Sequence, residues 1–244
     1  MFSDKELSNI LFLDIETARS HYQLNELSEG MQKMWEHKAQ MMDKDSEQTP
    51  QEKYKDKAAI FAEFGRVVCI SVALIHFVNN EPHLKLKSYY GENENEILLQ
   101  FKELLDQKLD PKKYPNLQLA AHNGKEFDYP YLCRRLLINQ IQLPKILQIQ
   151  NKKPWEVQLL DTMEMWKFGD KKNFTKLELL CHIFDIPSPK DNIDGSQVGE
   201  YFWERKEYKT IAQYCEKDVV ATAQLIMKYS LKPLIKEENI EYSL

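Results

Sequence analysis

Four acidic residues are the part of this chain best suited to chemistry, although they lie far apart in the sequence. Asp14 and Glu16 end a short apolar run, Asp128 follows a polar turn, and Asp218 lies in a helical stretch. Carboxylate oxygens are the ligands that Mg²⁺ and Mn²⁺ prefer. Carboxylates gathered at one buried place are costly unless a cation lies between them. The set therefore predicts a two-metal centre that hydrolyses a phosphodiester bond.

The first two acids lie at the end of a predicted buried strand, residues 10–15. Residues two apart on a strand point to the same face of a sheet, so Asp14 and Glu16 would face one site. Taken alone, the pair has a simpler explanation, a helix-capping acid next to a solvated one.

Tyr214 precedes Asp218 by one helical turn, and side chains four apart on a helix share a face. The hydroxyl of Tyr214 could therefore orient the water that a metal at Asp218 activates. An ordinary tyrosine pKa near 10 makes it a better orienting group than a base. A buried tyrosine beside a surface acid is the structural alternative.

Asp128 stands just before Tyr129-Pro130, where a proline near the first helical position indicates a helix start. A helix N-cap is thus a complete structural explanation for Asp128. The preceding Asn123-Gly124 turn would also bring Asp128 to the sheet edge where the other acids lie. Asn123 itself could contact substrate or be only a turn residue.

The order of elements predicts an α/β fold with a mixed sheet flanked by helices. Strands are expected at 10–15, 66–78, 83–89 and 117–121 and just before Asp161. Helices are expected at about 94–108, 128–139, 175–184 and 207–229. Residues 20–62 read as a helical insertion, with capping boxes at Thr49 and, later, at Thr175. We expect a single domain over 1–244.

Composition narrows the class of protein. Apolar residues make up 43% of the 244 positions, which is ordinary for a soluble globular chain, and no apolar stretch is long enough to span a membrane. The four cysteines form no Cys-x-x-Cys pair, which favours reduced thiols in a cytoplasmic protein. A net charge of −5 argues against sequence-blind wrapping of duplex DNA, but not against gripping a strand end.

The motifs together resemble the DEDD exonuclease superfamily, in its tyrosine-containing branch. No histidine lies in the five residues before Asp218, which separates the chain from the histidine branch. A closer similarity is to the predicted exonucleases related to the proofreading domain of family B DNA polymerases. The residues that carry the resemblance are Asp14-Ile15-Glu16, Asn123 with Phe127-Asp128, Phe64 to Ala73, Asp194-Gly195-Ser196, and Tyr214 with Asp218.

The resemblance implies a ribonuclease H-like fold with a mixed five-stranded sheet, three strands antiparallel and two more parallel to the first. It implies that Asp14, Glu16 and Asp218 bind one divalent ion, Mg²⁺ or Mn²⁺, with Asp14 shared to a second. Asp128 would hold the second ion largely through water. Tyr214 would position the attacking water, and the product would be a nucleoside 5′-monophosphate.

Other contacts to the phosphates are predicted less directly. Asn123, Lys190 and Ser196 are candidate substrate-binding residues, whereas Arg134 and Arg135 fit an ordinary helix surface better. The expected partner is the 3′ end of a single strand, DNA rather than RNA. With no room for a polymerase domain, any proofreading role would need a separate polymerase or repair chain. An RNA 3′-end trimmer and a non-catalytic nucleic-acid-binding scaffold are the alternatives.

Overall fold

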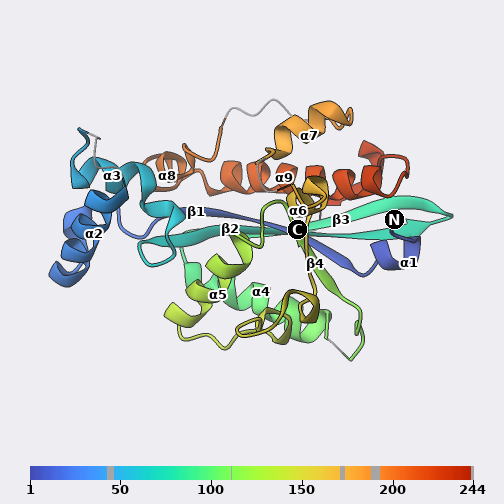
Figure 1. Ribbon diagram of the computed structural model, residues 1–244, viewed down its shortest axis with the longest axis horizontal. Coiled ribbons are helices and arrows are strands. Elements are labelled where there is room, and N and C mark those ends of the chain that lie inside the picture. Colours follow the sequence, from blue (N-terminus) through green and yellow to red (C-terminus); the bar gives the residue numbers. More distant parts are fainter. Residues whose placement is uncertain (43–46, 111, 171–173, 188–192, 243–244) are drawn as a thin grey trace.

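A mixed sheet of six strands forms the centre of the chain in the computed structural model (Figure 1). The structure describes residues 1–42, 47–110, 112–170, 174–187 and 193–242. The strands are β1 Ile10–Arg19, β2 Gly65–Val78, β3 Glu81–Tyr90, β4 Gln118–Ala121, β5 Leu159–Asp161 and β6 Ile240–Tyr242. Their order across the sheet is β5-β4-β1-β2-β3-β6.

The pairing confirms the predicted fold class. β1, β2 and β3 are antiparallel neighbours, and β4 and β5 run parallel to β1. The sheet exceeds the five expected strands by β6, which pairs parallel to β3 at the outer edge. Three residues form β6, too few for a period-two pattern to stand out in the sequence.

A two-residue turn fixes the register of the β2–β3 hairpin. Asn79 and Asn80 both take positive φ angles, 51° and 67°. A type I′ turn needs this conformation at both central positions, and asparagine tolerates it better than most residues. Consequently Val78 pairs with Glu81, and His76 pairs directly with His83.

Helices cover both faces of the sheet (Figure 1). The long helix α9, Tyr208–Tyr229, packs on one face through Val219, Ala223 and Ile226. The opposite face is covered by α4 Glu94–Glu103 and α5 Asp128–Ile138. The other α-helices are α1 Asp4–Leu7, α2 Glu29–Met42, α3 Pro50–Lys57, α6 Thr162–Lys167, α7 Leu177–Ile183 and α8 Val198–Glu200. Within the described ranges, no helix has the length and apolarity of a membrane span.

The insertion folds around a small aromatic cluster at one end of the sheet, where Figure 1 shows α2 and α3. Trp35 is fully buried against Tyr54 and Phe64, and its indole Nε1 donates to the carbonyl of Pro50 at 2.8 Å. The predicted capping box at Thr49 is present. The insertion therefore has its own hydrophobic cluster.

A buried ion pair corrects the expectation that Arg135 is ordinary helix surface. Its guanidinium donates to both carboxylate oxygens of Glu94, at 2.8 and 2.6 Å, while Arg134 is exposed. Glu94 also accepts the backbone amide of Val67 at 2.7 Å. The pair thus joins α5, α4 and β2, and Arg135 is not available to a phosphate.

Candidate metal and catalytic centre

One cavity brings the four predicted carboxylates together. Asp14, Glu16, Asp128 and Asp218 all line a cavity of about 340 Å³. They arrive from β1, from the start of α5 and from α9, three segments that are distant in the sequence. The remaining lining residues are Ile15, His122, Asn123, Phe127, Phe174, Lys176 and Leu177.

The β1 strand carries the first two acids. Asp14 pairs with Ser71 and Glu16 with Cys69 on β2, and the register shifts just after Glu16. Helix α9 contacts the same strand, since the Cys215 thiol lies 3.3 Å from both the carbonyl oxygen and Oδ2 of Asp14. Burial raises the pKa of Cys215 well above its usual value, so the sulfur stays protonated and donates.

Asp128 reaches the same strand, but it is not the helix N-cap that its position predicted. It is the first residue of α5 and Phe127 occupies the N-cap, so Asp128 does not cap the helix. Its Oδ1 instead accepts the amide of Ile15 at 3.1 Å. The β1–β4 pairing stops at Phe12, so β4 no longer supplies a partner for this amide. The carboxyl takes that position and is thereby held between Asp14 and Glu16.

Tyr214 and Asp218 lie one turn apart on α9, as the spacing predicted. Asp218 lines the cavity, but Tyr214 is not among the lining residues. The Tyr214 ring packs beside the cluster that contains Phe202 and Ile211. Its hydroxyl lies 4.0 Å from the point where a Cβ on Gly195 would stand. The structure thus places the tyrosine against the Asp194-Gly195-Ser196 segment.

The carboxyls oppose one another's ionisation. Burial, and then the charges of Asp128, Asp218 and Glu16, raise the pKa of Asp14 well above its usual range. Burial and the nearby Asp218 do the same to the pKa of Glu16. Burial raises the pKa of Asp128 to about 7. A cluster that holds protons in this way is suited to releasing them when a cation binds.

The donor atoms around the cavity fit a hard divalent cation. The Cys215 sulfur is protonated, and both nitrogens of His122 have other partners: Nδ1 lies 2.9 Å from Thr162 Oγ1, and Nε2 lies 3.0 Å from the carbonyl of Thr175. That carbonyl can only accept, so Nε2 carries a proton, and burial lowers the pKa of the ring. Carboxylate oxygens remain as ligands, the set that Mg²⁺ and Mn²⁺ prefer.

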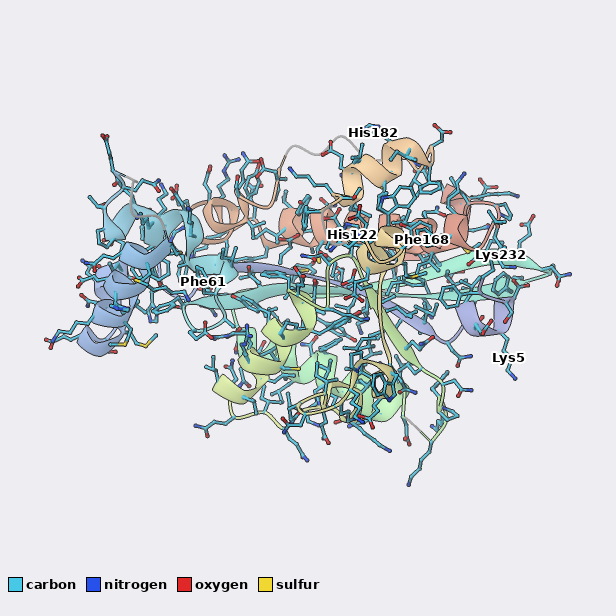
Figure 2. All side chains as sticks on the ribbon, viewed as in Figure 1. Lys5, Phe61, His122, Phe168, His182 and Lys232 are labelled. Atoms are coloured by element: carbon cyan, nitrogen blue, oxygen red, sulfur yellow. The ribbon has the colours of Figure 1, made fainter. Side chains whose placement is uncertain are left out.

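His122 therefore connects the turn beside it to two distant residues, Thr162 and Thr175. Figure 2 shows it near the middle of the molecule. The prediction of a capping box at Thr175 is wrong, because Lys176 is the N-cap residue of α7 and its side chain makes no capping hydrogen bond. The carbonyl of Thr175 instead accepts a hydrogen bond from His122 Nε2. This bond holds the neighbouring residues Phe174 and Lys176 at the cavity.

Asp161 is a positioning residue that sequence reasoning missed. Its two oxygens accept the amides of Asn123 and Lys125, at 3.1 and 3.0 Å, and those of Met163 and Glu164 at the start of α6. It therefore holds the turn in which Asn123 takes a positive φ of 61°. The sequence does contain an indication of this role, since an aspartate directly after a predicted strand is a favourable N-cap for a following helix.

The predicted substrate-binding residues have different positions. Asn123 lines the cavity, and its buried Oδ1 has no hydrogen-bond partner among the described residues. Ser196 is exposed, bonds to Asp194 and does not line the cavity. Lys190 lies outside the described residues. Lys176, which was not predicted as a site residue, places a positively charged side chain at the cavity.

Comparison with protein families decides the family. Residues 60–239 match the family described as predicted 3′–5′ exonucleases related to the exonuclease domain of PolB. The chain belongs to this family. The match begins after Asp14 and Glu16, so the first acidic pair is placed by the geometry of β1 alone. Exonuclease domains of this kind use divalent metals.

A solved structure shows the same fold. The chain is similar to the family B DNA polymerase of the hyperthermophilic archaeon Pyrobaculum calidifontis, with a TM-score of 0.53 and 14% identity. The similarity covers 91% of this chain but only 24% of the polymerase chain. No curated protein matches the sequence. The fold is thus similar to that of the PolB exonuclease domain.

Proposed function

We propose that this protein is a metal-dependent 3′–5′ exonuclease that hydrolyses the ends of single strands, DNA in preference to RNA, to nucleoside 5′-monophosphates. The observation that carries the proposal is the convergence of the four carboxylates on one cavity, where burial and mutual charge raise the pKa of Asp14, Glu16 and Asp128. Family membership supports the direction of cleavage.

The residues divide the work as follows. Asp14, Glu16, Asp128 and Asp218 would hold two divalent ions, which when bound activate a water and stabilise the charge on the phosphate. The Ile15 amide and the Cys215 thiol fix the orientation of Asp128 and Asp14, so these carboxylates need little rearrangement to bind.

Three groups around the carboxylates would contact the substrate or the attacking water. Lys176 places a positive charge at the cavity, where it would contact a phosphate. Asn123 offers its unpartnered Oδ1 to a hydrogen-bond donor of the terminal nucleotide or to a water. Tyr214 would orient the attacking water after its hydroxyl turns away from Gly195.

The setting of the activity is also a proposal. The net charge of −5 suits a protein that grips a few nucleotides of a strand end. We expect proofreading or repair, alongside a separate polymerase or repair chain. All four cysteines are unpaired, which supports a reducing compartment such as the cytoplasm.

The test offers 5′-labelled single-stranded DNA and matched RNA to the wild type and to Asp14→Ala, with Mg²⁺ or Mn²⁺. A ladder that shortens from the 3′ end and is absent in the variant supports the proposal. The strand that is cut faster identifies the sugar. Binding of both strands without cleavage would indicate a scaffold. Equal cleavage by wild type and variant would point to a contaminating nuclease.

A further inference from the structure

A second group of metal-binding side chains lies at the outer end of the sheet. His76 on β2 and His83 on β3 are direct cross-strand partners, and their ring centroids are 5.3 Å apart. Glu241 on β6 adds a carboxylate whose Oε1 lies 3.9 Å from His76 Nε2 and 3.9 Å from His83 Nδ1. One ligand atom from each of the three lies within 4.8 Å of the others.

This group is separate from the carboxylate cavity. His76 lies five residues along β2 from Ser71, the partner of Asp14, which corresponds to roughly 17 Å along a strand. None of the three side chains lines that cavity. They are partly open to solvent, with exposed side-chain fractions of 42% for His76, 20% for His83 and 54% for Glu241. A soluble ion can therefore reach them directly.

We propose that His76, His83 and Glu241 bind a zinc-like transition-metal ion. Two imidazoles and one carboxylate are a ligand set suited to Zn²⁺, and they leave a fourth tetrahedral position for water. Mg²⁺, which prefers oxygen ligands and near-octahedral geometry, is a poor fit. The two sites of this chain therefore differ in the metals they select.

The three ligand atoms must move closer together to bind one ion. Zinc bonds of about 2.0–2.1 Å in a tetrahedron set neighbouring ligand atoms about 3.3 Å apart. The 3.9 Å distances here must shrink by about 0.6 Å, and the two imidazole nitrogens, which lie within 4.8 Å of each other, must also reach that separation. The rings stand on paired strands with a register fixed by the Asn79-Asn80 turn, and the longer Glu241 side chain can close the distance.

Metal at this point would fasten β6 to the sheet. β6 has three residues and pairs only with β3 among the described strands. Glu241 is one of them, whereas the two histidines belong to the long hairpin. An ion shared by all three would stabilise the folded chain, because the unfolded chain does not hold these ligands together.

The experiment measures Zn²⁺ binding by equilibrium dialysis in excess Mg²⁺, which competes for the carboxylate cavity. The variants are His76→Gln, His83→Gln and Glu241→Gln, and the matched control is His37→Gln, an exposed histidine on α2. We expect one Zn²⁺ per wild-type chain, retained in His37→Gln and in Asp218→Ala but lost in both cluster histidine variants. Glu241→Gln should bind more weakly.

Two further measurements keep the outcome clear. Zn²⁺ should raise the thermal midpoint of the wild type and His37→Gln but not of His76→Gln, and should shift the ring ¹⁵N signals of His76 and His83. Zinc binding that survives in both cluster histidine variants, or no zinc bound by the wild type, overturns the proposal. A wild-type midpoint that does not respond to zinc, with His76→Gln melting lower whether or not zinc is present, would mean an ordinary ion pair, and also overturns it. Retention of zinc in Asp218→Ala separates this result from the fate of the nuclease proposal.

Discussion

Replacing Asp128 with asparagine should remove a pH-dependent loss of stability from the metal-free protein. Burial raises the pKa of this carboxyl from 3.8 to about 7. The folded chain therefore holds the proton more tightly than the unfolded chain does. The stabilising effect of that proton is complete below about pH 4, and it is lost as the pH rises through about 7.

The size of the effect follows from the difference in pKa. At about 1.4 kcal/mol per pKa unit, the ionised carboxylate costs the metal-free fold about 4 kcal/mol above pH 7, of which about 3 kcal/mol is lost between pH 5 and pH 8. Asparagine keeps an oxygen that can accept the Ile15 amide, so the hydrogen bond at 3.1 Å survives while the charge is removed.

The assay is urea denaturation in EDTA at pH 5 and pH 8. We expect the free energy of unfolding of the wild type to fall by about 3 kcal/mol more than that of Asp128→Asn. Asp185→Asn, at an exposed position, is the matched control and should follow the wild type. Adding Mg²⁺ or Mn²⁺ at pH 8 should restore the wild type more than Asp128→Asn. An identical pH dependence in the wild type and Asp128→Asn would refute the reasoning.

Three other predictions test the supports of the site. Arg135→Met should lower the free energy of unfolding by about 3–5 kcal/mol, because it leaves the carboxylate of Glu94 buried without its partner. The control Arg134→Met, at an exposed position, should change the free energy of unfolding by less than about 0.5 kcal/mol in the same denaturation assay. Asp161→Ala should cost at least about 2 kcal/mol, since four amides lose their acceptor, and Asp161→Asn should cost less; equal losses would argue against the charge. Tyr214→Phe should slow hydrolysis in a single-turnover assay and leave Mn²⁺ affinity unchanged, and an unaltered rate would remove the hydroxyl from the mechanism.

The fold was predictable wherever a local pattern had one stable outcome. The apolar run before Asp14 forms a strand because it has no polar face to expose, and Thr49 with Glu52 caps a helix because both groups are local to one turn. Boundaries were less predictable: β1 extends to Arg19, well beyond the apolar run, because its later residues pair with β2. The edge strand β6 gave no pattern of its own.

Errors arose where a side chain had two partners to choose from. Asp128 has the position of an N-cap, yet its carboxyl accepts an amide of β1 more than a hundred residues away in the sequence. Thr175 has the spacing of a capping box, yet its carbonyl receives His122. Arg135 lies where the sequence pattern predicts a helix surface, yet its side chain is buried in an ion pair with Glu94. The local sequence is the same in either case, so only the distant partner decides.

The sequence by itself determined which chemistry was present: four carboxylates on a strand, at a helix start and on a long helix, with a tyrosine one turn from the last. The tertiary structure alone decided that the carboxylates share one cavity. It also decided that hydrogen bonds of Cys215, His122 and Asp161 position the residues around that cavity. The physical reason is that each position of the sequence specifies its own side chain, but not the distant residues that will surround it. Desolvation and mutual charge, which raise the pKa of Asp14, Glu16 and Asp128, exist only once distant segments meet.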